Sequence, residues 1–176
     1  MLDLREGGER LEKKDLKPVG RFAVHLLLTG IFLYVMFGVM FGIQPMADED
    51  MAPRISAGDL MLYFRREDVL RPGDVLVFDT DEGRKAGRIA ACGGDCVDFT
   101  EDGSLSVNGS IVVESGIYGK TFKVDNDRTY PLVLEEDTYF VLGDQRERAK
   151  DSRTFGAVER QKIKGKVILL LKRNGL

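Results

Sequence analysis

The sequence predicts a mainly β domain, a sandwich or partly open barrel, behind one N-terminal transmembrane helix. Residues 22–47 contain no Asp, Glu, Lys or Arg, which is typical of a membrane span. After Ala47 short apolar runs alternate with turn signals every ~8–15 residues, and no convincing amphipathic helix follows. The β domain of about 130 residues is long enough to bury a core.

Composition excludes several classes of protein. The chain has 176 residues, which suits one soluble domain plus an extra segment. It is 43% hydrophobic and 31% charged with a net charge of -3, so it resembles neither a disordered chain nor a nucleic-acid binder. The single histidine, His25, lies in the apolar run and argues against a His-based metal site or a Ser-His-Asp triad. We therefore expect no metal and no cofactor.

Three parts are expected along the chain: a cytoplasmic N-terminal segment (1–21), a transmembrane anchor (22–45) and an extracytoplasmic β domain (46–176). The apolar core of the anchor, residues 22–43, would span about 33 Å as a helix and match a hydrocarbon layer of about 30 Å. A buried core helix and a cleaved signal peptide are the alternatives. The uncharged run is too long for either, which favours an uncleaved anchor.

Orientation follows from the charges that flank the anchor. Six basic residues precede it, namely Arg5, Arg10, Lys13, Lys14, Lys17 and Arg21. Behind it come Asp48, Glu49 and Asp50, and the first basic residue is Arg54. We therefore expect a single-pass protein of the cell membrane with its N-terminus in the cytoplasm and its C-terminal domain outside.

The strands of the β domain are expected in order. Runs 58–65 and 71–80 each begin near a Gly-Asp turn, and residues 86–99 indicate a strand, a Gly-Gly turn and another strand. A hairpin is expected at 103–113, because Asn108-Gly109 is the strongest short-range hairpin signal. Residues 137–144 and 166–172 complete the set of predicted strands.

Three motifs carry chemistry or architecture: "DMAP" at Asp50, "GRIAACGGD" from Gly87, and "GDQRERAKDSRTFG" from Gly143. "RPGDVLVF" and "LSVNG" lie between them. In this order and spacing, residues from about 21 to the C-terminus resemble the bacterial type I signal peptidases, membrane-anchored Ser-Lys proteases that remove signal peptides. The resemblance implies a signal-peptidase-like β domain. It is most specific at Gly143, Asp144, Arg146, Asp151, Ser152, Arg153 and Gly156.

The same resemblance implies that three positions which hold catalytic residues in the family hold other residues in this chain. It places the nucleophilic serine at Asp50, the lysine base at Gly87, and a serine that orients the lysine at Ala149. The threonine that usually follows the proline is Arg54. Because losing a nucleophile or its base costs about 10⁶ in turnover in a well-studied serine protease, we expect no catalytic residues and no physiological peptidase activity.

Stand-ins for the lost residues are conceivable. Lys85 has the strand parity of Gly87 but lies two residues away, about 7 Å along a strand. Ser56 and Ser152 are the candidate serines. A carboxylate pair of Asp50 with Asp144 or Asp151 is another alternative. The Asp50 charge could instead pair with Arg88 or Arg146 and close the site, or face a basic group on a client.

The remaining motif residues are assigned structural or groove roles by the resemblance. They are Met51, Pro53, Arg88, Asp144, Arg146, Asp151, Ser152 and Arg153. An Asp151–Arg153 ion pair, extended by Asp144 and Arg146, is expected to hold the floor of a peptide groove; a solvated charged turn is the alternative. Met51 is expected to be exposed, on a loop at the membrane surface where its side chain dips among lipids, the alternative being a loop residue packed on the domain.

Cys92 and Cys96 bracket a tight turn. Outside the cell two cysteines suggest a disulfide, which would stabilise so short a loop by about 2 kcal/mol. Two free thiols are the alternative.

Among relatives, the chain most resembles the catalytically silent SipA-type proteins of Gram-positive pilus gene clusters, which carry the same Asp-for-Ser and Gly-for-Lys changes. The resemblance implies a pseudoenzyme, a non-proteolytic chaperone in pilus assembly. Its partners would be a pilin or other exported protein, a sortase and membrane lipid, and not nucleic acid. The alternatives are an active type I signal peptidase that uses other residues and an engineered inactive mutant.

Overall fold

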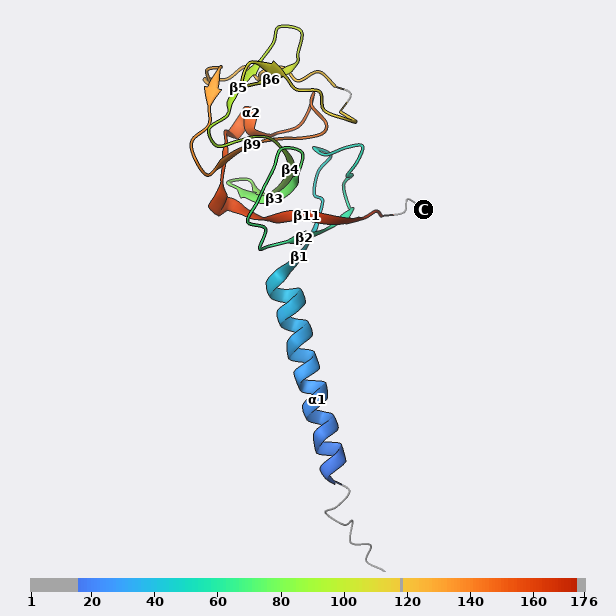
Figure 1. The fold of residues 1–176 in the computed structure, drawn as a ribbon. Helices are drawn as coiled ribbons and strands as arrows, with labels where there is room; N and C mark the ends of the chain where they lie inside the picture. Colours follow the sequence, from blue (N-terminus) through green and yellow to red (C-terminus); the bar gives the residue numbers. More distant parts are fainter. Residues whose placement is uncertain (1–15, 118, 174–176) are drawn as a thin grey trace, which may run out of the picture. The chain divides into compact units, whose positions relative to one another are not determined.

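The computed structural model describes residues 16–117 and 119–173 and divides them into two units, which meet between Val39 and Met40. Most of the expected cytoplasmic segment, residues 1–15, therefore lies outside the described residues. The elements of the chain are drawn in Figure 1.

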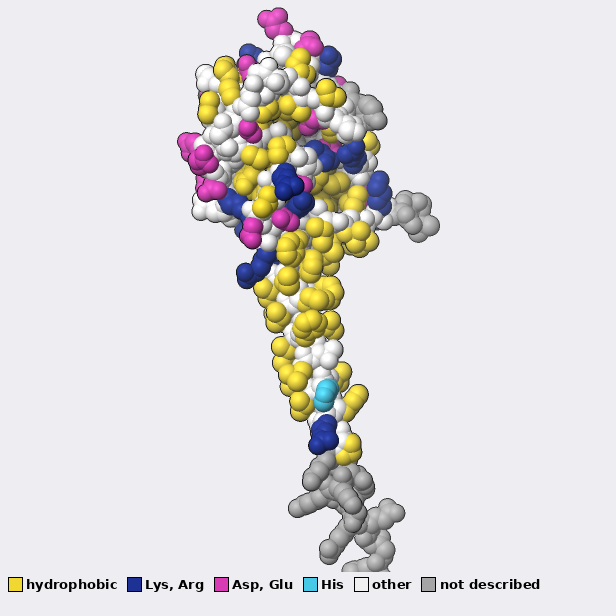
Figure 2. Space-filling model, in the orientation of Figure 1, with side chains coloured by type: hydrophobic (Ala, Val, Ile, Leu, Met, Phe, Trp, Pro, Cys, Tyr) yellow, Lys and Arg dark blue, Asp and Glu magenta, His cyan; other side chains and the backbone are white. Residues whose placement is uncertain are grey.

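The N-terminal unit is one apolar helix. Helix α1 (Leu16–Tyr34) continues as the π-helical turn η1 (Val35–Met40). Residues 18–40 form a stretch of 23 residues with a mean hydropathy of 2.1, long and apolar enough to cross a membrane. Its large apolar side chains are exposed along the helix, as the yellow side chains in Figure 2 show. This helix is consistent with membrane anchoring.

The helix ends earlier than the anchor expected at 22–45. Phe41–Pro45 forms strand β1, which pairs antiparallel with β2 (Leu60–Phe64). Gly42 allows this pairing, because a Cβ at that position would lie 2.2 Å from Cζ of Tyr63. An apolar strand and the end of an apolar helix have the same composition, and hydropathy alone does not separate them.

The C-terminal unit consists of two antiparallel sheets and confirms the prediction of a mainly β fold. The large sheet has the order β1-β2-β11-β3-β4-β9-β10. Its other strands are β3 (Val75–Thr80), β4 (Gly83–Cys92), β9 (Thr138–Leu142), β10 (Val158–Glu159) and β11 (Ile163–Leu171). The small sheet has the order β7-β6-β5-β8, with β5 (Cys96–Phe99), β6 (Leu105–Val107), β7 (Ser110–Ile111) and β8 (Leu132–Val133).

The β6–β7 hairpin matches the turn chemistry of the sequence. Asn108 and Gly109 have φ angles of 54° and 77°, so the β6–β7 hairpin turns through two residues with positive φ, as a type I′ turn requires. The short helices α2 (Ser152–Phe155) and η2 (Arg160–Lys162) are the other helical segments described in this unit.

Strand β4 positions the candidate site. Residues 83–88 pair with β3 along one edge of β4, whereas β9 pairs along the other edge only at residues 88–92. Among the strands that the structure describes, none pairs with that second edge at residues 83–87. This half of β4 lies where Lys85 and Gly87 are found.

Candidate functional site

The loop after β1 carries Asp48 and Asp50 and is held by its own hydrogen bonds. The backbone N–H of Ala52 donates to the Glu49 carbonyl, and the N–H of Ile55 donates to the Met51 carbonyl. The backbone N–H of Asp50 donates to Oδ1 of Asp48 at 3.1 Å. The loop is therefore a folded turn with both carboxylates fixed near one another.

The expectation that Met51 is exposed is wrong. Its side chain is fully buried, with 0% of its surface exposed, in a core cluster with Met46, Ile55, Met61 and Tyr63. Met51 thus anchors the acidic loop in the domain and does not reach lipid. The charged residues around it in the sequence obscured this, because a single apolar residue in a turn has no periodicity to reveal which way it points.

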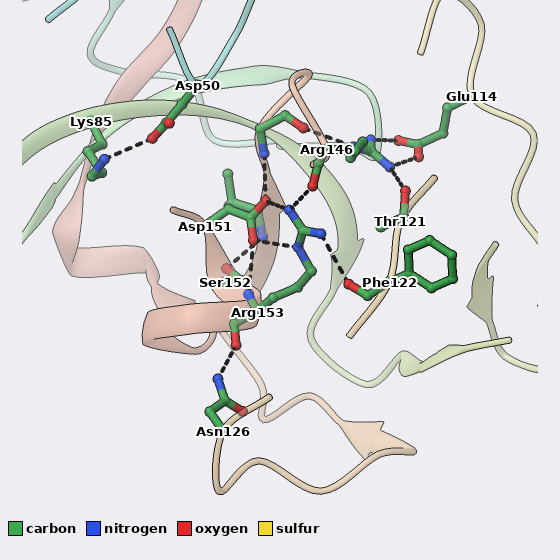
Figure 3. Close-up of polar contacts among 12 residues, drawn as sticks. Asp50, Lys85, Glu114, Thr121, Phe122, Asn126, Arg146, Asp151, Ser152 and Arg153 are labelled. Carbon is green, nitrogen blue, oxygen red and sulfur yellow. Dashed lines mark hydrogen bonds and ion pairs between the residues drawn. The ribbon is translucent and has the colours of Figure 1, made fainter. Parts of the chain in front are cut away.

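Lys85 of β4 reaches across to this loop (Figure 3). Its Nζ lies 2.9 Å from Oδ2 of Asp50, the contact drawn in Figure 3. The same Nζ lies 3.1 Å from Oδ2 of Asp48. Only 13% of the Lys85 side chain and 16% of the Asp50 side chain are exposed. Burial acts to lower the pKa of Lys85, but the hydrogen bonds and charges of Asp50 and Asp48 outweigh it and raise that pKa above its ordinary value. Lys85 is therefore a paired ammonium group.

Of the two possibilities left open for the Asp50 charge, pairing with Arg88 or Arg146 is not found, because Asp50 pairs with Lys85. Arg88 instead forms a two-point ion pair with Asp144, at 2.8 and 2.6 Å, and donates to the Gly73 carbonyl. The hydrogen bond from Arg88 to Asp144 raises the pKa of the guanidinium. Lys85 lies two residues from Gly87 along β4, and its long side chain nevertheless reaches Asp50.

At Gly87, the position expected for a lysine base, core side chains pack closely against the backbone. A Cβ there would lie 2.5 Å from Cγ1 of Val141 and 3.4 Å from the ring of Phe78. Both neighbours are buried in one core cluster. The space next to Gly87 is thus occupied by core side chains, and a longer residue at position 87 requires the core to shift.

The other two changed positions, Asp50 and Ala149, both lie next to Gly143. A Cβ on Gly143 would lie 2.3 Å from the Cβ of Ala149 and 2.5 Å from the carbonyl oxygen of Asp50. That carbonyl also accepts a hydrogen bond of 3.0 Å from the backbone N–H of Gln145. The structure therefore places Asp50 and Ala149, two positions to which the resemblance assigns catalytic roles, on either side of Gly143.

The Asp151–Arg153 pair is a buried structural centre, and Figure 3 shows its bonds. Arg153 donates to both carboxylate oxygens of Asp151, at 2.9 and 2.8 Å, and to the carbonyls of Arg146 and Phe122. Asp151 also accepts from the backbone N–H groups of Gly143 and Arg153. The pair is almost fully buried, which excludes the alternative of a solvated charged turn.

Ser152 has a structural task in this centre. Its Oγ accepts a hydrogen bond of 2.9 Å from the backbone N–H of Val141, and the residue is fully buried. The hydroxyl thus ties α2 to strand β9, the strand that packs over Gly87.

Arg146 extends the network to a partner that the sequence did not indicate. Its guanidinium forms a two-point ion pair with Glu114, one bond of which is 2.6 Å, and donates to Oγ1 of Thr121. Arg54 adds a second tie, since it donates to the carbonyl of Ser115 at 2.9 Å. Two arginines thereby hold the segment around Glu114 and Ser115. No local pattern pairs residues so far apart in the chain.

Cys92 and Cys96 are both free thiols in the structure, the second of the two alternatives. Cys92 ends β4 in the large sheet and Cys96 begins β5 in the small one. Burial raises the pKa of the Cys92 thiol, and the charges of Asp95 and Asp74 act in the same direction. Cys92 is thus a poor nucleophile at neutral pH.

The geometry of the site limits its chemistry. A base must accept a proton, but Lys85 is held protonated by two carboxylates. In serine proteases the backbone N–H of the nucleophile contributes to the oxyanion hole. Here the N–H of Asp50 already donates to Asp48, and two carboxylates lie next to it. An oxyanion at this place would meet negative charge and no free donor on residue 50.

Comparisons with known proteins identify the family of this chain. The family described as "Signal peptidase, peptidase S26" matches residues 20–171. Signal peptidases IB of Staphylococcus aureus strains COL and Mu50 are each 26% identical over 169 residues, which cover 86% of this chain and 88% of theirs. A signal peptidase I from Enterococcus faecalis V583 has a TM-score of 0.48 and 26% identity, covering 57% of this chain and 98% of that one. Since the family match spans most of its residues, the chain belongs to the S26 signal peptidase family.

Proposed function

We propose that this chain is a membrane-anchored member of the family that does not cleave peptides and instead binds an exported protein during pilus assembly. One observation carries the proposal: Asp50, at the position expected for the serine, forms an ion pair with Lys85, and the position expected for the lysine base holds Gly87. The carboxylate is a poor nucleophile toward an amide, and the paired ammonium takes up no proton.

The intact scaffold supports a binding role. The ion pairs Asp151–Arg153 and Arg88–Asp144 and the fold around them are present although the chemical positions are changed. The second edge of β4 at residues 83–87 is unpaired among the described strands. An extended segment of a client can add to such an edge through main-chain hydrogen bonds, with no chemistry needed.

The client and orientation follow from the resemblance to pilus-assembly relatives and from the charges that flank the anchor. The domain would lie outside the membrane and hold a secreted pilin near a sortase. Cells that lack the protein should secrete pilin normally but fail to polymerise it. The natural protein should restore polymers, whereas a chain without residues 22–43 should not. Accumulation of uncleaved precursor pilin in the deletion strain would contradict the proposal.

An active signal peptidase is the second candidate, and it is favoured by the family itself and by relatives that are named signal peptidases. The two are separated by incubating the full chain in detergent with a signal-peptide substrate. We expect no cleavage by the natural protein. Cleavage that is abolished in Asp50→Ala but retained in the matched surface variant Asp127→Ala would establish the peptidase.

Orientation is tested separately with an impermeant thiol reagent on whole cells. A cysteine introduced at Ser104 should react, and one introduced in residues 1–21 should not. Labelling of the N-terminal site from outside would contradict the proposed topology.

A further inference from the structure

Three neighbouring strands of the large sheet, β1, β2 and β11, carry apolar side chains on both of their faces. On one face Met61, Tyr63 and Leu170 pack in the core cluster that also holds Met51. Because successive side chains of a strand point to opposite faces, the residues between them point away from this core. We call that side the outer face. It carries Phe41, Ile43, Pro45, Leu60, Leu62, Phe64, Leu169 and Leu171.

The outer face is exposed and uncharged. Ile43, Leu60, Leu169 and Leu171 are 66%, 40%, 49% and 54% exposed. An antiparallel sheet with one face in water usually alternates apolar with polar residues. Here all five residues of β2 and residues 167–171 of β11 are apolar or aromatic, so the alternation is missing. A continuous exposed apolar surface of this kind indicates a binding surface for a protein or a membrane.

Chain connectivity places the outer face beside the membrane. The apolar span ends at Met40 and β1 begins at the next residue, Phe41, so no linker separates them. The strands β1, β2 and β11 are consecutive in the sheet (Figure 1). A strand of this length extends about 17 Å and neighbouring strands lie about 4.8 Å apart, so the whole face lies within roughly 20 Å of the end of the span. Lipid is therefore the surface within its reach.

Basic residues stand at the ends of two of these strands. Arg65 follows β2 directly, and Lys172 follows β11. The backbone N–H of Arg65 donates to the Met40 carbonyl and its Nε donates to the Phe41 carbonyl, each at 2.8 Å, which holds Arg65 at the start of β1. Long basic side chains at the border of an apolar surface cover part of it with their stems and keep the charge in water or among headgroups. This border suits a bilayer surface.

We propose that the outer face rests on membrane lipid, in the boundary between the headgroups and the acyl chains. The domain is then held at the bilayer by β1, β2 and β11 in addition to the helix. Apolar surfaces of proteins enter that boundary by about 5–10 Å. The inference rests on the membrane anchoring of the chain proposed above, and it does not depend on whether the protein cleaves peptides.

Tryptophan fluorescence tests the contact, because the natural chain contains no tryptophan. The full chain with Leu169→Trp is placed in phosphatidylcholine vesicles with and without bromine on the acyl chains, since bromine quenches a tryptophan that it touches. We expect blue-shifted emission and a loss of about twofold or more in the brominated vesicles. The matched control Val113→Trp, at a residue that is 92% exposed beside the small sheet, should emit as in water and not be quenched. Equal quenching of both variants would refute the contact.

A third variant, Leu28→Trp in α1, separates this inference from the anchoring. If Leu28→Trp is quenched and Leu169→Trp is not, the anchor stands and the outer face does not lie on lipid. If neither is quenched, the anchoring itself fails. Blue-shifted emission of Leu169→Trp without quenching would show that protein covers the face, which excludes lipid.

A charge on the outer face should lift it from the bilayer. With Leu171→Trp as the reporter, Ile43→Glu should reduce the quenching about twofold or more, because a carboxylate is costly to place in an apolar layer. Ile111→Glu, at a residue of similar exposure outside the outer face, should leave the quenching unchanged. Circular dichroism in detergent checks the fold of both variants, and Ile43→Ser replaces Ile43→Glu if the latter does not fold. Unchanged quenching in the folded variant at position 43 would overturn the proposal.

Discussion

Nζ of Lys85 lies between Oδ2 of Asp50 and Oδ2 of Asp48, at 2.9 and 3.1 Å. Lys85 of strand β4 thus forms ion pairs with two residues of the loop that precedes β2, and its positive charge balances part of the negative charge of the two carboxylates. The contribution of this ion-pair bridge to stability can be measured.

Replacing Lys85 by Met should lower the free energy of unfolding by about 1–3 kcal/mol, because two half-buried carboxylates lose their hydrogen-bonded partner. Thermal unfolding of the chain in detergent, followed by circular dichroism, measures the change. Lys150→Met is the control. Its ion pair with Glu82 is exposed, so the loss should be less than about 0.5 kcal/mol. Equal effects at both positions would show that the bridge adds no stability.

The stabilising effect of the bridge should depend on pH in the alkaline range. The folded protein holds the pKa of Lys85 above the ordinary value of 10.5. The contribution is therefore fully present below that value and is lost as the pH rises through the folded pKa. The difference in stability between the natural protein and Lys85→Met should be constant near neutrality and should shrink above about pH 10.5. A difference that disappears already at pH 9 would contradict the raised pKa.

Gly87→Ala should destabilise the domain by about 1–3 kcal/mol, since the new Cβ would lie 2.5 Å from a buried Val141 methyl group. Val141→Ala in the same chain should recover part of the loss relative to the sum of the single changes. Gly119→Ala, whose Cβ would have no neighbour nearer than 3.4 Å, is the matched control. Strict additivity of the two changes would show that Val141 is not the obstacle.

The contact between Gly87 and Val141 also determines which substitutions could introduce a Ser-Lys pair. The sequence suggests Asp50→Ser, Gly87→Lys and Ala149→Ser as the smallest set with a chance. Because Val141 and Phe78 occupy the space beside Gly87, this triple variant should fold poorly and cleave nothing. Adding Val141→Ala is the step that makes room for a lysine. A signal-peptide cleavage assay on the two variants compares them, and cleavage by the triple variant alone would refute the packing argument.

Ser152→Ala should lower the free energy of unfolding by about 1–3 kcal/mol, because it leaves the buried backbone N–H of Val141 without an acceptor. Thermal unfolding provides the measurement. Ser110→Ala, on the exposed edge strand, should have little effect. If both changes are neutral, the hydroxyl of Ser152 is not needed to hold α2 against β9.

Both cysteines should be alkylated by iodoacetamide in the denatured protein without prior reduction, and intact mass spectrometry should show two adducts. In the folded protein Cys92 should react slowly near pH 7 and faster as the pH rises, because its thiol pKa is raised. No adducts without reductant would establish the Cys92–Cys96 disulfide.

Much of the fold was predictable because strands and turns leave local signals. The Asn108-Gly109 hairpin and the runs that became β2, β3 and β9 follow from alternation and turn residues. The C-terminal end of the anchor could not be predicted from the sequence, since β1 is as apolar as the helix before it. Pairing with β2, which lies well beyond it in the sequence, decides the difference.

At the site, the family motifs located Asp50, Gly87 and Ala149 but not what surrounds them. The partner of Asp50 depends on how far the flexible side chain of Lys85 extends across two elements, and neither strand parity nor spacing contains that information. The packing of Val141 against Gly87 likewise depends on the register between β4 and β9. Long-range side-chain contacts are set by tertiary structure, so they appear only with the coordinates.

The hydrogen bond from the Asp50 backbone to the Asp48 carboxylate has a pharmacological consequence. Inhibitors of Ser-Lys proteases that acylate the serine, or mimic its tetrahedral adduct, need a nucleophile and a free donor for an anionic oxygen. This chain presents a carboxylate in place of the first and has already engaged the N–H of residue 50. An inhibitor of that design should therefore not bind covalently to this protein.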